Sequence, residues 1–186
     1  MNRTSGVAVL YYYGANDMKI WTVITAALLA GCASAPKVDN SVVKSFDLNR
    51  YIGEWYEIAR FDHSFERGVQ EAKAKYALRK DGKVEVLNSG VKGGKTKLAK
   101  GVGKTTATPG LLRVTFFWPF YADYRVMALD DAYTAALVGS GGANYLWILS
   151  RTPSLDEKKK DDLLSEASRR GYDTSKLIWV RQKEQP

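Results

Sequence analysis

Short segments in which apolar and charged residues alternate constrain the fold of this 186-residue chain more than any other feature. The clearest segment is 71–79, where Ala, Tyr and Leu occupy every second position and Lys or Arg occupies most of the others. A period of two places successive side chains on opposite faces, which is typical of a half-buried β-strand. Asp81-Gly82 then provides a tight turn into a second alternating segment, 83–86, so the pattern predicts an antiparallel hairpin.

Comparable segments recur along most of the chain. The predicted strands are one that opens at Gly53, followed by 71–79, 83–86, 95–104, 112–116, 124–129, 134–138 and 144–151. Eight closely spaced strands joined by turns favour an all-β fold, either an antiparallel sandwich or a closed up-and-down barrel.

The period changes after the eighth predicted strand. Ser154 and Glu157 match a capping box, with Ser154 as the N-cap, and the apolar positions that follow predict one α-helix ending near Gly171. Its apolar face is narrow, so we expect the helix to lie outside the barrel. A last short strand is predicted over 177–180.

The N-terminal part contains an apolar run followed by the only cysteine of the chain. The run 20–31 is shorter than the roughly 20 residues that span a bilayer, and it follows Lys19, as in a secretory signal. Residues 29–32, LAGC, resemble the lipobox of bacterial lipoproteins, in which Cys32 would carry acyl chains such as palmitate. The alternative is an ordinary signal peptide with an unrelated cysteine.

We therefore divide the chain into three parts. Residues 1–31 are predicted to be a signal peptide, in which 1–17 are a mis-assigned start and Met18 is the initiator. Residues 32–45 are predicted to be the lipidated N-terminus and a flexible tether, and 46–182 the folded domain. An Asp directly after the lipidated cysteine resembles the inner-membrane retention signal of bacterial lipoproteins. Here Ala33 follows Cys32, so we expect an outer-membrane protein that faces the periplasm.

Three sequence blocks resemble those of the lipocalin family, in family order. They are GEW at 53–55, preceded by NRY at 49–51, then LDDAY at 129–133 and WILSR at 147–151. The longer strings WYEIARFDHSFERG, FFWPFY and YLWILSRTP are similar to bacterial lipocalins, a branch of outer-membrane lipoproteins. The resemblance implies an eight-stranded antiparallel up-and-down lipocalin barrel with a C-terminal α-helix.

The resemblance also implies how the barrel floor is built. Gly53 would let the chain bend into the first strand, and Trp55 would plug the floor. Arg151 would lie across the indole of Trp55 and bond carbonyls near Tyr51. Asp130, in the second block, would belong to the same structural end of the barrel.

The ligand-lining residues are predicted from the strand faces opposite Lys and Arg. They are Trp147, Tyr145, Tyr124, Val126, Phe116, Val114, Tyr76 and Ala74. An eight-stranded barrel is just wide enough for one small ligand, and an apolar lining with a few phenol and indole groups suits an acyl chain with a polar head. The alternative is a packed barrel without a cavity.

Other chemistries have little support in the sequence. His63 is the only histidine and follows Asp62, yet no Ser or Cys nucleophile lies in a recognisable elbow, so we expect His63 at the rim or surface and no catalytic residue. One histidine cannot form a site of several imidazoles, so no metal or other cofactor is expected. The net charge is +8, but Lys and Arg are scattered, which disfavours nucleic acid as a partner.

The sequence thus predicts a non-enzymatic outer-membrane lipoprotein that binds, stores or transports lipids such as fatty acids or lysophospholipids. Two alternatives remain: a lipid-modifying enzyme that uses Asp62 and His63, and an envelope scaffold that binds no ligand. The expected partners are the lipid ligand and the membrane, and both a monomer and a homodimer are possible.

Overall fold

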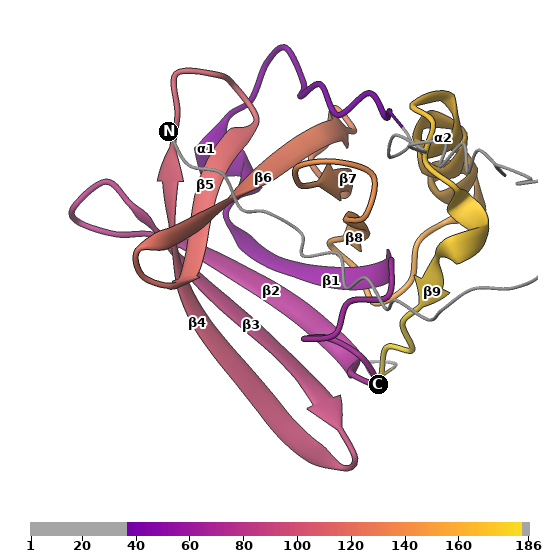
Figure 1. Ribbon diagram of the computed structural model, residues 1–186, viewed down its shortest axis with the longest axis horizontal. Coiled ribbons are helices and arrows are strands. Elements are labelled where there is room, and N and C mark those ends of the chain that lie inside the picture. Colours follow the sequence, from indigo (N-terminus) through magenta and orange to yellow (C-terminus); the bar gives the residue numbers. More distant parts are fainter. Residues whose placement is uncertain (1–36, 184–186) are drawn as a thin grey trace, which may run out of the picture. The chain divides into compact units, whose positions relative to one another are not determined.

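Antiparallel pairing between consecutive strands closes this chain into a barrel (Figure 1). The computed structural model describes residues 37–183. The barrel strands are β1 Gly53–Arg60, β2 Gln70–Leu78, β3 Val84–Lys92, β4 Lys95–Thr105, β5 Leu111–Phe117, β6 Phe120–Leu129, β7 Ala135–Gly139 and β8 Leu146–Ser150. Each strand pairs with the next, and β1 pairs with both β8 and β2, which closes the ring. The predicted eight-stranded antiparallel barrel is confirmed.

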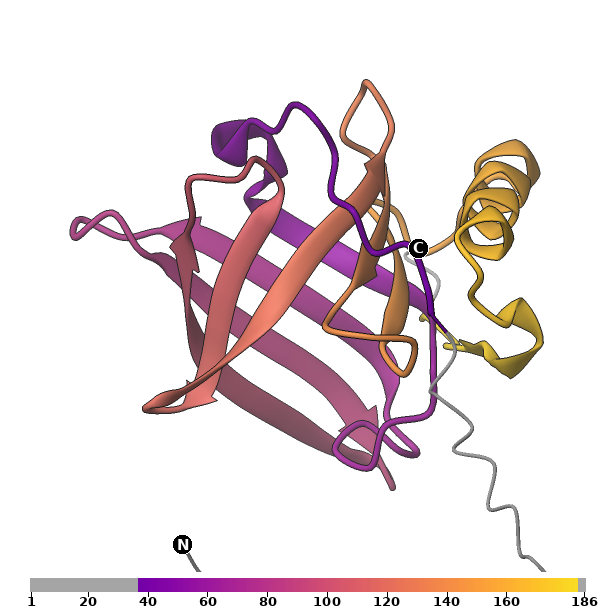
Figure 2. The ribbon, with the colours of Figure 1, turned by 45° about the horizontal axis from the view of Figure 1, so that its top comes forward.

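The two ends of the barrel differ. Helix α1 (Leu48–Tyr51) lies at the end that carries the β2–β3, β4–β5 and β6–β7 turns, and we call this the closed end (Figure 2). The β1–β2, β3–β4, β5–β6 and β7–β8 connections lie at the opposite end, which we call the mouth. This arrangement follows from up-and-down topology, in which alternate turns fall at opposite ends.

Helix α2 (Glu157–Arg169) lies outside the barrel, as predicted. Leu163 and Ala167 are buried in a cluster that includes β1, β7 and β8 residues. The predicted N-cap is wrong: Asp156, not Ser154, accepts a hydrogen bond from the Lys159 amide at 2.9 Å. The Ser154 carbonyl instead accepts from the Thr152 hydroxyl in the preceding turn. No helix within residues 37–183 is long and apolar enough to cross a membrane.

Residues 37–45 are not a flexible tether, in contrast to the sequence prediction. The Asp39 amide donates to the Arg170 carbonyl, and the Val43 amide donates to the Val126 carbonyl, each at 2.9 Å. The buried Arg170 side chain also donates to the Ser41 carbonyl at 2.7 Å. These bonds hold the segment against the barrel, because a buried guanidinium needs acceptors that the segment supplies. Any tether therefore ends before Lys37, and the lipidation site predicted at Cys32 lies outside the described residues.

The C-terminal segment fills a gap in the barrel wall. The short 3₁₀-helix η1 (Thr174–Lys176) leads into β9 (Ile178–Trp179), which pairs with β1 through Ala59 and Arg60. The β1–β2 pairing runs only from Gly53 to Tyr56 on the β1 side, and beyond it the Glu71 amide donates to the Arg181 carbonyl at 2.8 Å. The segment thus supplies backbone partners where β1 and β2 diverge.

Candidate functional site

A fully buried tryptophan seals the closed end. The Trp55 indole donates to the Tyr51 carbonyl at 2.8 Å, and the guanidinium carbon of Arg151 lies 3.9 Å from the centre of the indole ring. The Arg151 guanidinium also donates to five backbone carbonyls, those of Arg50, Tyr51, Ile52, Glu54 and Tyr133. One planar cation therefore stacks on the indole and joins α1, β1 and the β6–β7 turn.

Gly53 and Asp130 fix the backbone around this floor. Gly53 has a φ of +105°, and a Cβ at this position would lie 3.1 Å from Nη1 of Arg151. Only glycine fits both the backbone conformation and the space that the guanidinium occupies. Asp130 accepts hydrogen bonds from the Thr134 and Ala135 amides at 2.6 and 2.8 Å and thereby closes the β6–β7 turn.

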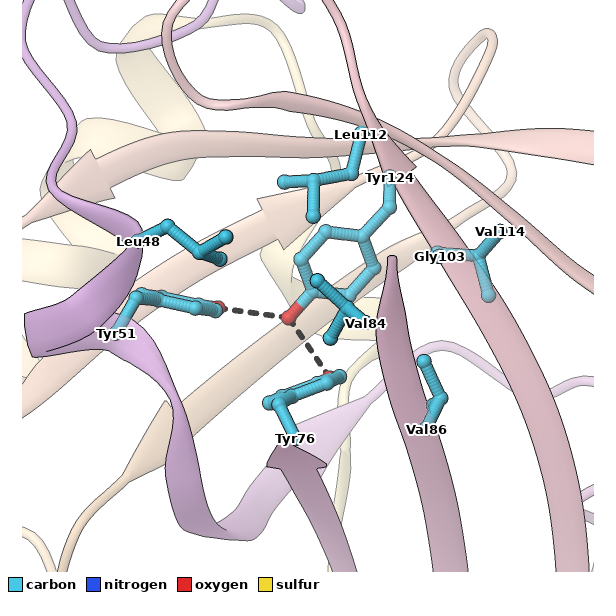
Figure 3. A pocket seen from close by; sticks show the side chains of 9 residues that line it. All are labelled: Leu48, Tyr51, Tyr76, Val84, Val86, Gly103, Leu112, Val114 and Tyr124. Atoms are coloured by element: carbon cyan, nitrogen blue, oxygen red, sulfur yellow. Dashed lines mark hydrogen bonds between the residues drawn. The ribbon is translucent and has the colours of Figure 1, made fainter. Parts of the chain in front are cut away.

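Above the floor lies a nearly filled pocket that contains three tyrosines (Figure 3). It is lined by Leu48, Tyr51, Tyr76, Val84, Val86, Gly103, Leu112, Val114 and Tyr124. The Tyr124 hydroxyl lies 2.7 Å from the Tyr51 hydroxyl and 2.9 Å from the Tyr76 hydroxyl. The free volume is about 10 Å³, which is room for about one water molecule.

The three tyrosine hydroxyls carry more protons than their mutual bonds use. Burial raises the pKa of each phenol, so all three are protonated. Two hydrogen bonds link the three hydroxyls, so one O–H group has no acceptor within the triad. The lower lumen is therefore apolar except for one spare hydrogen-bond donor.

The mouth-side half of β1 turns two charged side chains toward the lumen. A bulge between Glu57 and Ala59 shifts the register, so that Glu57 pairs with Leu149 and Arg60 pairs with Trp147 on β8. Glu57 accepts from Nη1 of Arg60 at 2.6 Å, and both residues are buried. Burial and then the nearby Glu66 carboxylate raise the pKa of Glu57 to about 8, although the Arg60 guanidinium opposes the shift.

The β1–β2 loop folds over this ion pair. Nη2 of Arg60 donates to the Glu66 and Val69 carbonyls at 2.8 and 2.9 Å, and the Glu66 carboxylate accepts from the Trp147 indole at 3.1 Å. Burial raises the pKa of Glu66 as well. The wall near the mouth thus carries two carboxyl groups for one guanidinium.

His63 is buried among aromatic rings. Its exposed fraction is 5%, and its ring stacks between Phe65 and Tyr145 at centre distances of 5.2 and 4.9 Å, with Trp147 also at 4.9 Å. Of the expected rim or surface position, the rim is right and the surface is wrong: His63 lies in the β1–β2 connection at the mouth but is covered, because its ring packs against Phe65, Tyr145 and Trp147. Burial lowers the pKa of His63, and Arg60 lowers it further, so the imidazole is neutral near pH 7.

Three polar atoms on the lumen side lack hydrogen-bond partners within the described residues. They are Nε of Arg60, Nε2 of His63 and Oδ1 of Asn88. Arg60 and Asn88 both lie on the lumen side, since Arg60 pairs with Trp147 and Asn88 pairs with Ala74. Buried polar atoms normally have partners, so these three mark a place for water or a polar ligand group.

The predicted lining residues lie at two levels. Tyr76, Val114 and Tyr124 line the closed-end pocket, while Ala74 and Val126 belong to the same interior cluster. Trp147 and Tyr145 stack with His63 nearer the mouth. Phe116 is 38% exposed, and its ring lies over Gly101, 3.0 Å from where a Cβ would stand. The structure therefore brings together two groups of these residues, and the Phe116 ring lies on the lumen face beside Gly101, which pairs with Val86.

Sequence reasoning missed Glu57, Arg60 and Glu66 as lumen residues. It assigned charged residues to the outer face, and the bulge in β1 then reversed the parity of Arg60. The usable signal was the sequence WYEIAR at 55–60, in which Glu57 and Arg60 stand three residues apart and so break the alternation of period two.

The pair proposed for catalysis is not assembled. The Asp62 carboxylate accepts from Nε of Arg67 at 2.9 Å and forms a 2.7 Å ion pair with the same guanidinium, on the exposed side of the loop. The His63 ring contacts Tyr145 and Trp147 instead. Within residues 37–183, no three His, Cys, Asp or Glu side chains gather closely enough to hold a metal ion.

Comparisons with known proteins agree with the geometry. The model of the lipocalin-like domain family matches residues 46–182. The outer membrane lipoprotein Blc of Escherichia coli K12 is 46% identical over 164 residues, which cover 85% of this chain and 93% of that protein. The Vibrio cholerae protein of the same name is 41% identical over 169 residues, with 88% and 98% covered. Mouse apolipoprotein D is 31% identical over 169 residues, with 85% and 86% covered.

Solved structures show the same fold. Insecticyanin from the tobacco hornworm Manduca sexta superposes with a TM-score of 0.66 at 25% identity, covering 81% of this chain and 87% of that one. Lobster apocrustacyanin A1 gives a TM-score of 0.63 at 17% identity, with 74% and 81% covered.

Proposed function

The chain belongs to the lipocalin family, and on that basis we propose that it is an outer-membrane lipoprotein whose barrel binds an amphiphile such as a fatty acid or a lysophospholipid. Cys32 would carry the acyl anchor, and the barrel would face the periplasm and store or transport its ligand. The names of the bacterial relatives, outer membrane lipoproteins, support this location.

The observation that carries the ligand proposal is the polarity gradient along the lumen. Valines and leucines from β3, β5 and β6 line the lower part, whereas the unpartnered atoms of Arg60 and His63 lie on the mouth side. An amphiphile that enters tail first would match this gradient, because its apolar chain leaves water and its head finds polar partners. Since only about 10 Å³ is free at the tyrosine triad, the tail would end above it.

Binding is favoured over catalysis for this site. The carboxylate of Asp62 is bound to Arg67, and His63 is enclosed by rings, so neither group is presented to a substrate as an acid–base pair. The site offers hydrogen-bonding groups and aromatic faces, which hold a head group without reacting with it.

Trp147 provides the test. Its ring lies between the floor and the mouth, so a monomeric lysophospholipid or long-chain fatty acid should change the tryptophan fluorescence of the protein. Trp147→Phe should remove most of this change. The matched control is Trp179→Phe, because Trp179 is 49% exposed on β9, outside the lumen, and this variant should respond as the parent does.

The same titration separates the alternatives. A parent that binds neither amphiphile would favour the scaffold. If the parent released a hydrolysis product from the lysophospholipid and His63→Ala did not, the enzyme alternative would be favoured. An unchanged response in Trp147→Phe would place the ligand elsewhere.

A further inference from the structure

The tip of the β5–β6 hairpin exposes an unusual amount of aromatic surface. Phe117, Trp118 and Phe120 are 81%, 82% and 79% exposed. Side chains of this size rarely stand together in water unless they contact a partner or a membrane. None of the three belongs to either buried cluster of the described residues, so they do not hold the barrel together.

This tip lies at the mouth of the barrel. Phe65 on the β1–β2 loop is 65% exposed at the same end. The β3–β4 hairpin beside that loop carries Lys92, Lys95 and Lys97, which are exposed and make no salt bridge within residues 37–183. Lys92 reaches the loop, since its Cε lies 3.7 Å from where a Cβ of Gly68 would stand. The mouth thus presents exposed aromatic rings on two of its connections and unpaired lysines on a third.

The N-terminal segment starts beside the mouth-side end of the short strand β7, which pairs with the middle of β6 at Arg125. Lys37 lies beside Gly171: its carbonyl is 3.5 Å from where a Cβ of Gly171 would stand. Tyr172, which follows Gly171, reaches the mouth-side end of β7, where its hydroxyl is 3.2 Å from where a Cβ of Gly139 would stand. Five Cα–Cα steps separate Cys32 from Lys37, which limits their distance to about 18 Å. An acyl anchor on Cys32 would therefore lie within reach of the mouth.

We propose that the tip formed by Phe117, Trp118 and Phe120 inserts into the lipid surface that holds the anchor, so that the mouth of the barrel faces the bilayer. The proposal rests on the proposed function, which supplies the anchor and the membrane. It adds a route for the ligand: an amphiphile could pass between the bilayer and the lumen without crossing bulk water.

A lipid surface fits this tip better than a second protein copy. The tip is the narrow end of a two-stranded hairpin, which can penetrate a deformable interface but offers little flat area for a protein contact. Tryptophan favours the membrane–water interface, and the lysines at the same end of the barrel are attracted to anionic head groups.

Depth-dependent quenching tests the insertion. The mature lipidated protein would be reconstituted in vesicles of phosphatidylethanolamine and phosphatidylglycerol at 3:1, with bromine on the acyl chains. The Trp118 signal, obtained by subtracting the Trp118→Phe variant, should be quenched at least twofold by brominated lipid and little by aqueous iodide. The signal of Trp179, obtained in the same way, should show the opposite pattern.

A second measurement addresses the route. The variant with Phe117→Ser, Trp118→Ser and Phe120→Ser should load ligand from vesicles at least tenfold more slowly than the parent. The control Trp179→Ser should load at the parental rate. Both variants should bind a monomeric lysophospholipid with the parental affinity, because no changed side chain lies in the lumen.

Three outcomes would overturn the proposal. In the first, Trp118 is quenched by iodide and not by brominated lipid. In the second, the triple variant loads at the parental rate. In the third, the triple variant converts a dimer into a monomer while Trp118 of the parent stays unquenched by lipid, which would assign the tip to a second copy. Failure of the parent to bind monomeric amphiphile would instead refute the proposed function.

Discussion

At the scale of single residues, Arg151 has a role that lysine cannot fill. Its planar guanidinium stacks on Trp55 and donates to carbonyls from three separate segments. We expect Arg151→Lys to lower the free energy of unfolding by about 2 to 3 kcal/mol, because several carbonyls would lose their donor. Urea unfolding measures this difference.

The control is Arg50→Lys. The exposed Arg50 guanidinium stacks on Tyr133, and the substitution should lower the free energy of unfolding by less than about 1 kcal/mol. Equal stability of Arg151→Lys and the parent would contradict the role.

Glu57 makes a pH-dependent contribution to stability. Burial and the neighbouring Glu66 raise the pKa of Glu57 to about 8 from an ordinary value of 4.5. The folded state therefore keeps a proton that the unfolded chain releases. The stability associated with this proton is fully present below pH 4.5 and is lost as the pH rises through about 8.

Replacing Glu57 by Gln should remove this dependence. The amide oxygen of Gln can still accept from Arg60, but it cannot titrate. Urea unfolding between pH 5 and 9 should show a decline for the parent that is clearly smaller in Glu57→Gln. The control Glu54→Gln changes an exposed carboxylate on the same strand and should keep the parental decline. Parallel curves for parent and Glu57→Gln would argue against a retained proton.

Sequence reasoning succeeded at residues whose environment follows from strand parity or family blocks. Trp55 and Arg151 were paired from the resemblance, and the structure gives them a direct contact. Glu57 and Arg60 could not be placed, because the rule that ionisable side chains face water fails where a carboxyl group and a guanidinium bond to each other inside. His63 could not be placed either, since its cover comes from the distant Tyr145 and Trp147.

At the scale of elements, periodicity together with turn residues located every barrel strand but not every boundary. The predicted segment 83–86 is too short: the strand, β3, continues to Lys92. The prediction stopped early because Asn88 and Gly90 face the lumen and interrupt the apolar alternation. Gly90 is required there: a Cβ would lie 2.4 Å from a methyl carbon of Val69. Such contacts join segments far apart in the sequence, and a local pattern does not contain them.

Helix α2 illustrates how close competing signals can be. Both Ser154 and Asp156 are good N-cap residues, and the capping-box spacing favoured Ser154. The turn over residues 151–154, in which the Thr152 hydroxyl bonds the Ser154 carbonyl, delays the helix by two residues. Position 156 then places a carboxylate at the helix N-terminus, where it also interacts favourably with the helix dipole.

At the scale of the whole molecule, the segment before β1 links the barrel to the membrane in the proposed function. Because residues 37–45 are bound to the barrel, only 33–36 separate the anchor from the folded part. So short a connection would keep the barrel next to the lipid surface and restrict its orientation, which a longer flexible tether would not do.

The last prediction concerns Cys32. Stable anchoring takes more than one acyl chain, since each buried CH₂ group contributes about 0.8 kcal/mol. Cys32→Ser should therefore move the protein from the outer-membrane fraction to the soluble periplasmic fraction. Its melting temperature should not change, because the bonds described between this segment and the barrel are made by residues from Asp39 onward. A matched control is Ala33→Asp, which keeps the lipidation site but introduces a residue that resembles the inner-membrane retention signal. It should stay membrane-bound and shift to the inner-membrane fraction. If Cys32→Ser combined with Phe117→Ser, Trp118→Ser and Phe120→Ser remained with outer membranes after a high-salt wash, the acyl anchor would be refuted. The triple change removes the aromatic tip, and the salt screens the attraction of the lysines.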